Sequence, residues 1–471
     1  MAKKGARRKP YLWEALLCIA FLVISLYFVV IRWDRDPHMA LVISAVFATL
    51  VALRTGISWD ELETGLIDSI YSSVKAILIL LVVGMLIGIW ILGGVVQTFV
   101  YYSLLVLSPK IFLVIVCILC AITSLATGSS WATAGTVGIA AIGVGQGMGI
   151  PLAMVGGAVI SGAYFGDKMS PVSDTTNLAP AVSESKLFDH IYHMVYTVMP
   201  SMIIALIAYT ILGFSLDTGA SEESIKQVIH VLGENYNISP MLLIPPLAVI
   251  AMVIFKLPLL PSFMGGVFLG VVGALIFQGA SLAEVITVMH YGYVGETGVE
   301  VVDVLLSRGG FNSMLWLASV ILCSLTFGGI LEKVGILEVI IAEIFALVES
   351  PGSLIMSNVL CCILTNALTA DQYLAIIVPG RIYKSAYEQR KLHTKNLSRV
   401  LEDSGTMTSS LIPWSSCGAF MAGTLGVATL AYAPFAFLVL LNPLVSVIYG
   451  YTGITMEKVQ DGVAAGAAVS F

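Results

Sequence analysis

The chain has 471 residues, of which 58% are apolar and only 11% are charged, and its mean hydropathy is +0.96. Soluble domains carry about 25% charged residues, so the composition excludes an ordinary water-soluble domain, and the absence of alternating segments of about ten residues excludes a membrane β-barrel. The net charge of −6 carries little information, because orientation in a membrane follows the positions of Lys and Arg. We therefore expect an all-α polytopic membrane protein.

The first element follows a basic tail, residues 1–10, which reads MAKKGARRKP. The apolar run from Tyr11 to Ile31 is longer than the apolar core of a signal peptide, about 7–15 residues, and it has no small-residue cleavage site. We therefore expect an uncleaved first helix. Because positively charged flanks stay in the cytoplasm, we expect a cytoplasmic N-terminus.

Apolar stretches recur along the rest of the chain and fall into two halves around a polar, acidic segment. The halves share identical residues at a constant spacing of 242, so that Pro109 recurs as Pro351 and Pro171 recurs as Pro413. The pattern predicts a first transmembrane repeat at residues 11–215, a polar extracytoplasmic linker at 216–238, a second transmembrane repeat at 239–450 and a C-terminal tail at 451–471.

The basic residues predict opposite orientations for the two repeats. Residues 381–399 carry six Lys and Arg residues, whereas the equivalent residues 139–157 carry no charge. By the positive-inside rule the first segment is cytoplasmic and the second is not. Inverted-topology repeats, with discontinuous helices at their interface, are typical of secondary transporters.

Polar clusters at residues 123–135 and 365–373 occupy equivalent positions in the two halves. Each cluster follows an apolar run and turns through small or polar residues. We expect each to be the tip of a re-entrant helical hairpin, with an ordinary surface loop as the alternative. Their candidate oxygen ligands are Thr123, Ser124, Thr365 and Asn366.

A second pair of polar clusters contains the most unusual stretch, FGDKMSPVSDTTN at residues 165–177, with its counterpart at 402–416. Pro171 removes one helical hydrogen bond and disfavours helical geometry at the preceding residue, so residues 166–177 predict a broken helix. Non-helical backbone at membrane depth is tolerated where it is buried or lines a cavity. Oxygen groups exposed at such a break suit a hard cation such as Na⁺, and the further candidate ligands are Ser173, Thr175, Thr176, Asn177 and Ser415.

Carboxylates lie in or beside these clusters. A charge at the bilayer centre costs at least about 2.5–3.5 kcal/mol, so we expect these groups to bind Na⁺ or a proton; they are Asp174, Asp167, Asp403, Glu402 and Asp371. Lys168 is either an internal counter-ion or a residue that extends its ammonium group to the membrane surface.

Three segments resemble the NhaC-type sodium/proton antiporter family of bacteria: GAYFGDKMSPVSDTTNLAPAV at 162–182, RGGFNSMLWLASVILCSLTFGGILE at 308–332 and LSRVLEDSGTMTSSLIPWSSCGAFM at 397–421. The resemblance covers nearly the whole chain. It implies an ion-transporter fold with inverted repeats, hairpins and broken helices, and export of Na⁺ in exchange for H⁺ across the bacterial inner membrane. The family also holds members that exchange organic acids, such as malate against lactate, so an Na⁺/H⁺-coupled organic acid exchanger is the alternative.

The expected partners are Na⁺, H⁺ and the lipid bilayer, with Li⁺ or a small carboxylate as further candidates. A homodimer is expected because related folds often form one. The sequence has no HExxH, GxxxxGK[ST] or GxSxG motif. We therefore expect no cofactor, no nucleic-acid partner and no enzymatic activity.

Overall fold

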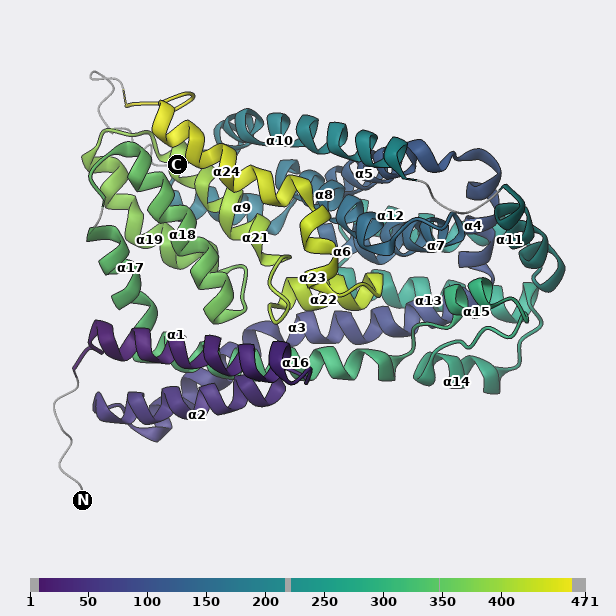
Figure 1. The fold of residues 1–471 in the computed structure, drawn as a ribbon, viewed down its shortest axis with the longest axis horizontal. Helices are drawn as coiled ribbons and strands as arrows, with labels where there is room; N and C mark the ends of the chain where they lie inside the picture. Colours follow the sequence, from purple (N-terminus) through teal and green to yellow (C-terminus); the bar gives the residue numbers. More distant parts are fainter. Residues whose placement is uncertain (1–7, 217–221, 347, 460–471) are drawn as a thin grey trace, which may run out of the picture.

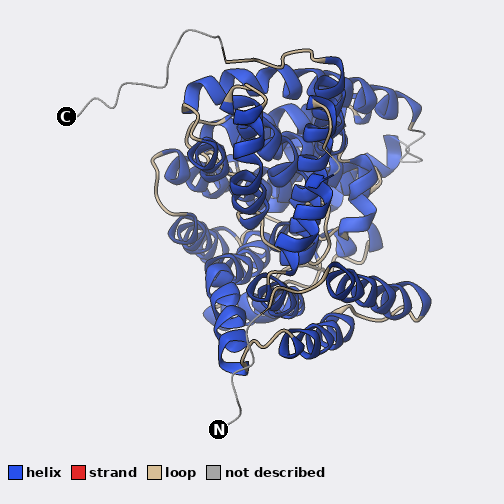
Figure 2. Ribbon diagram, turned by 90° about the vertical axis from the view of Figure 1, so that its left-hand side faces the viewer, coloured by secondary structure: helices blue, strands red, loops and turns tan. Residues whose placement is uncertain are grey.

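The computed structural model describes residues 8–216, 222–346 and 348–459, and within these ranges it contains 24 α-helices, five short π- or 3-10-helical segments and no β-strand (Figure 1, Figure 2). The predicted all-α class is confirmed. The first half contains α1 (Leu12–Leu26), η1 (Tyr27–Arg32), α2 (His38–Arg54), α3 (Trp59–Leu92), α4 (Val95–Val106), α5 (Pro109–Thr127), α6 (Ser130–Thr133), η2 (Ala134–Gly138), α7 (Ile139–Gly147), α8 (Leu152–Met169), α9 (Asp174–Ser183) and α10 (Leu187–Ser215).

Helix α11 (Glu222–Asn235) lies within the predicted linker and packs against α4 and α15. The second half contains η3 (Pro240–Leu243), α12 (Ile244–Ile254), α13 (Leu259–Phe277), α14 (Leu282–Tyr291), α15 (Glu300–Leu306), α16 (Phe311–Val334), α17 (Ile336–Ala346), α18 (Pro351–Thr369), α19 (Leu374–Gln389), α20 (Thr394–Leu401), η4 (Glu402–Thr406), α21 (Met407–Ser409), α22 (Ser416–Leu425), α23 (Thr429–Tyr432), η5 (Ala433–Phe435) and α24 (Phe437–Thr452).

By length and apolar composition, seven helices in the described part of the chain can cross a membrane, or up to nine if each of two bent helix pairs counts as one span. The seven segments are Leu12–Val30, Trp59–Leu92, Pro109–Thr127, Leu187–Ser215, Leu259–Phe277, Phe311–Val334 and Pro351–Thr369. This confirms a multi-pass membrane protein.

Helices of the two halves match at the spacing of 242 residues. Helices α5 and α18 begin and end at equivalent residues, and so do α9 and α22. The caps explain the shared bounds: α5 and α18 each begin with proline after a serine and each end before a residue in the left-handed region, Gly128 (φ 67°) and Ala370 (φ 58°). The sequence repeat is therefore also a repeat of helices, while its inverted orientation stays a prediction.

Two groups of helices can be distinguished (Figure 1). Helices α3 and α16 lie against each other and, with α1 and α2, form the lower part of the view. Helices α5, α8, α10 and α24 pack together in the upper part. Contacts cross between the repeats, because α9 packs on α19 and α20 while α22 packs on η2 and α7.

The basic segment 381–399, which is predicted to be cytoplasmic, contains helical structure and one buried arginine. Most of it is helical, in α19 and α20, and Arg399 has no exposed surface. Burial of Arg399 is explained by its neighbours, described below. Much of the basic N-terminal tail and of the C-terminal tail lies outside the described residues.

Candidate ion-binding site

Four helix breaks, two in each half, lie at the positions of the predicted polar clusters. Helix α5 ends before Gly128 and α6 begins at Ser130, while α8 ends at Met169 and α9 begins at Asp174. In the second half α18 is followed by residues 370–373, and α21 by residues 410–415. The predicted broken helices are confirmed.

Three of the breaks, together with the start of α22 that follows the fourth, meet at one cavity of about 630 Å³. The break residues that line it are Thr127, Gly128, Ser129, Ser130, Trp131, Asp167, Pro171, Val172, Ser173, Asp174, Thr175, Asp371, Gln372, Tyr373, Ser416 and Cys417. Helix α3 and the connection between α12 and α13 complete the wall and contribute two cations, Lys75 and Lys256. Polar groups separated by more than 240 positions in the sequence therefore share one space.

Helices α6, α9, α19 and α22 all begin at this cavity, and each start is capped. Serine oxygens accept from backbone amides at three of them: Ser129 from Ala132 N (3.1 Å), Ser173 from Thr176 N (3.5 Å) and Ser415 from Gly418 N (2.9 Å). At the fourth, Asp371 Oδ1 accepts from Leu374 N at 2.9 Å. Helix starts carry partial positive charge, so the cavity wall favours negative groups.

Three of the five predicted carboxylates line the cavity. Asp167 is buried and accepts hydrogen bonds from Ser130 N (3.1 Å) and Ser130 Oγ (2.6 Å), which joins the end of α8 to the start of α6. Asp371 is also buried, at the start of α19. Asp174 is exposed to the cavity as the first residue of α9, and it lies close enough to Asp167 for the two charges to interact.

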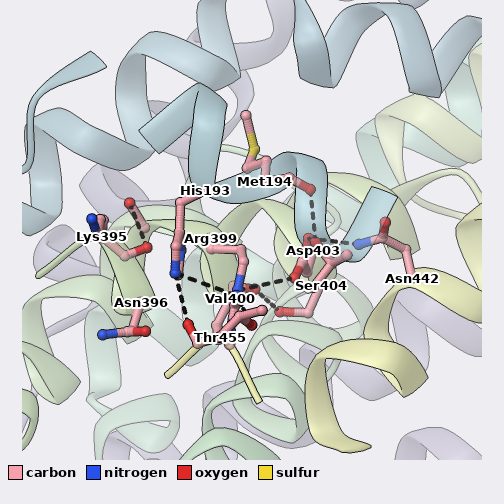
Figure 3. Close-up of polar contacts among 12 residues, drawn as sticks. His193, Met194, Lys395, Asn396, Arg399, Val400, Asp403, Ser404, Asn442 and Thr455 are labelled. Atoms are coloured by element: carbon pink, nitrogen blue, oxygen red, sulfur yellow. Dashed lines mark hydrogen bonds and ion pairs between the residues drawn. The ribbon is translucent and has the colours of Figure 1, made fainter. Parts of the chain in front are cut away.

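The other two carboxylates lie deeper, beside Lys168. Lys168 forms an ion pair with Asp403 Oδ1, and neither side chain has exposed surface. Lys168 is therefore an internal partner of Asp403 and does not reach the membrane surface. Thr197 donates to the same Asp403 oxygen at 2.9 Å. Asn442 also donates to it, at 2.6 Å (Figure 3).

The ion pair extends to Arg399, whose Nε lies 4.0 Å from Asp403 Oδ2 (Figure 3). Arg399 also donates to Thr455 Oγ1 at 2.8 Å, and His193 Nε2 lies 2.9 Å from Thr455 O. These contacts explain why one arginine of the basic segment 381–399 is buried.

Residues 453–459, which we call the C-terminal strap, bind to the segment that precedes Arg399. Backbone hydrogen bonds join His393 N to Glu457 O (2.9 Å) and Val459 N to Lys391 O (2.8 Å). An ion pair links Lys395 to Glu457 and lowers the pKa of the Glu457 carboxyl.

Four of the predicted ligands donate their hydroxyl groups to backbone carbonyls. Thr176 Oγ1 donates to Asp167 O (3.1 Å) and Lys168 O (2.9 Å), which caps the end of α8. The other three are Ser124, Thr365 and Ser415. Asn177 and Asn366 bond to backbone carbonyls through their amide nitrogens, and the buried Asn366 Oδ1 has no hydrogen-bond partner among the described residues. Ser173 and Thr175 line the cavity, while Thr123, half-buried on α5, does not.

Several residues at these sites are not predicted from the sequence. They are Ser130, Gln372, Lys75, Lys256, Thr197, Arg399 and Asn442. A signal exists for Asn442, an amide in the apolar run FLVLLNPLVSV, and for Ser130, which lies within the predicted hairpin tip at 123–135. Lys75 and Lys256 give no local signal, because only the fold brings them to the breaks.

Comparison with known proteins identifies the family. Residues 162–454 match the Na⁺/H⁺ antiporter family. The chain is 38% identical to the Na⁺/H⁺ antiporter NhaC of Alkalihalophilus pseudofirmus, covering 90% of this chain and 92% of that protein. It is 39% identical to the malate-2H⁺/Na⁺-lactate antiporter of Bacillus subtilis (95% and 96% covered) and 37% identical to the arginine/ornithine antiporter ArcD of Halobacterium salinarum (95% and 93% covered). The resemblance read from the motifs is confirmed: the chain belongs to the NhaC-type Na⁺/H⁺ antiporter family.

Proposed function

We propose that this protein exports Na⁺ from the bacterial cytoplasm in exchange for H⁺, by alternating access and without an enzymatic step. The observation that carries the proposal is the convergence of three helix breaks, the start of α22 and three carboxylates on one cavity. The named function of the NhaC relative agrees with it. In this proposal the N-terminus is cytoplasmic and the two repeats cross the inner membrane in opposite directions.

Asp174 is the proposed exchanging carboxylate. Its side chain is exposed to the cavity, whereas Asp167 and Asp371 already accept hydrogen bonds from helix starts. A nearby cation favours the ionised form of a carboxylate, and burial disfavours it. One carboxylate can therefore hold Na⁺ or H⁺, and competition between the two, combined with alternating access, is sufficient for exchange.

The crossed packing of the repeats supports alternating access. Helix α9 of the first repeat packs on α19 and α20 of the second, and α22 of the second packs on η2 and α7 of the first. Rocking of one repeat against the other moves the starts of α9 and α22 relative to the hairpins that complete the cavity. Rigid-body motion around a fixed midplane site is the general scheme for inverted-repeat transporters.

An Na⁺/H⁺-coupled organic acid exchanger is the second candidate, and the size of the cavity favours it. A volume of about 630 Å³ falls within the range of about 300–1,000 Å³ that is typical of small-molecule sites. The carboxylate of such a substrate needs a cation. Lys168, the cation expected from the sequence, is paired with Asp403, but Lys75 and Lys256 line the cavity.

Everted membrane vesicles from cells without their own antiporters distinguish the two candidates. An inside-acid pH gradient is imposed and followed with a fluorescent dye while NaCl, LiCl, KCl and then malate or lactate are added. We expect NaCl alone to collapse the gradient. A response that begins only after the organic acid is added would contradict Na⁺/H⁺ exchange and favour the second candidate, with Lys75 and Lys256 as the residues to substitute.

A further inference from the structure

Glu402 is a buried carboxylate that the contacts described above leave unused. Its side chain has no exposed surface, and neither Oε1 nor Oε2 has a hydrogen-bond partner among the described residues. Thr406 Oγ1 is buried as well and likewise has no partner in the described part of the chain. Both residues lie on the π-helical segment η4, one turn apart, so their side chains share one face.

The facing element is α9, which packs against η4 and α20. Thr406 and Thr175 lie near the Glu402 carboxylate without forming a hydrogen bond to it, and Lys168 and Asp167 act on it at longer range. Thr175 also lines the cavity. It therefore lies between the cavity and Glu402.

Unpartnered oxygens of this kind point to a missing cation. A buried polar group without a partner is costly, and a charged one more so, so native proteins retain such groups where a ligand satisfies them. Here the two carboxylate oxygens of Glu402 and the hydroxyl oxygen of Thr406 all lack a hydrogen-bond partner among the described residues. Carboxylate and hydroxyl oxygens are the ligands of hard cations, and π-helical segments are frequent at functional sites.

The charges around Glu402 favour the same ligand. The three carboxylates of this region are Asp167, Glu402 and Asp403, and the cations that face them are Lys168 and Arg399. When all five are ionised, one negative charge is left over. One monovalent cation neutralises it.

We propose that Glu402, Thr406 and Thr175 form a second Na⁺ site, behind the cavity and joined to it through Thr175. This inference deepens the proposed function and rests on it, because it assigns two Na⁺ sites to one chain, one at Asp174 and one at Glu402.

Equilibrium binding of ²²Na⁺ to the purified full-length protein, at alkaline pH where carboxylates are ionised, tests the inference. We expect the wild-type protein to saturate at two Na⁺ per chain. Glu402→Gln, which keeps the side-chain volume, saturates at one, and so does Asp174→Asn, while the double variant binds none. Thr406→Val weakens one of the two sites at least about tenfold, since even loss of an outer partner of a metal ligand costs about 10–100-fold.

Thr406→Ser is the matched control, because it keeps the hydroxyl group and is expected to bind like the wild type. Size-exclusion profiles check that each variant is folded; if Glu402→Gln does not fold, the pair Thr406→Val and Thr406→Ser decides. Two Na⁺ per chain in Glu402→Gln, or equal binding by the two Thr406 variants, would overturn the second site and leave Na⁺/H⁺ exchange intact. A wild-type protein that binds no Na⁺ would overturn both proposals.

Discussion

Replacing Asp403 with Asn is expected to destabilise the protein strongly, because it leaves two buried cations without their anion. Lys168, Arg399 and Asp403 have no exposed surface. The Arg399–Asp403 separation of 4.0 Å corresponds to an attraction of about 4 kcal/mol at an effective dielectric constant of about 20. Breaking a buried pair by removing one partner costs about 3–5 kcal/mol, and we expect the free energy of unfolding to fall by that amount.

Lys168→Met should cost less than Asp403→Asn. Without Lys168, Asp403 still has Thr197, Asn442 and Arg399 as partners. The double variant Lys168→Met/Asp403→Asn removes both members of the pair, so its loss should be smaller than the sum of the two single losses, with a coupling energy of about 0.5–3 kcal/mol.

The assay is SDS-induced unfolding of the purified protein in mixed micelles, with the four members of the cycle measured together. Asp189→Asn is the matched control, because Asp189 is exposed on α10 and its substitution should change stability by less than about 0.5 kcal/mol. Strictly additive losses, or an Asp403→Asn variant as stable as the control, would refute the buried ion pair.

Asp174→Asn should abolish Na⁺-dependent collapse of the pH gradient in vesicles while the protein still inserts, and wild-type turnover would remove Asp174 from the exchange step. Gly162→Ala should destabilise the protein by about 1–3 kcal/mol, because the added Cβ would lie 2.1 Å from Cys117 O where α8 packs on α5. Gly233→Ala should instead stabilise it by about 0.5–1 kcal/mol, because Gly233 is exposed on α11 and its nearest neighbour would lie 3.5 Å from the added Cβ. Equal shifts of the melting temperature in the two variants would contradict this packing. The ion pair with Lys395 lowers the pKa of the Glu457 carboxyl, so its stabilisation is present above the unfolded value near 4.5 and is lost as the pH falls through the lowered folded value. Glu457→Gln should therefore melt below the wild type at pH 7 and match it at the acid end of a pH series, whereas a constant difference would contradict the role of the strap.

Much of the fold follows from local chemistry that a single sequence displays. Pro171 blocks a helix wherever it lies, and the structure has its break at residues 170–173. The spacing of 242 residues carries serine caps and prolines with it, so the bounds of α18 follow from those of α5. Placing clusters of oxygen-bearing side chains inside a membrane costs free energy, so such clusters within apolar runs indicate where helices are interrupted.

The partners of the charged residues could not be predicted, because they depend on how distant helices cross. Asp403 and Asp174 lie in equivalent kinds of cluster, yet one is paired with Lys168 and the other is exposed to the cavity. Arg399 belongs to a basic segment, and its sequence neighbours do not indicate that it is buried. Asp403 lies four residues after it, whereas its other partner, Thr455, reaches it only because the strap packs on α20.

The most direct test of the central claim is ²²Na⁺ flux into proteoliposomes that contain only the purified protein. A pH gradient, inside acid, is imposed in buffer without any organic acid, and the wild type is compared with Asp174→Asn. We predict Na⁺ accumulation driven by the outward proton gradient in the wild type and background flux in the variant. Na⁺ movement that requires malate or lactate, or that persists unchanged in Asp174→Asn, would contradict Na⁺/H⁺ exchange at the cavity.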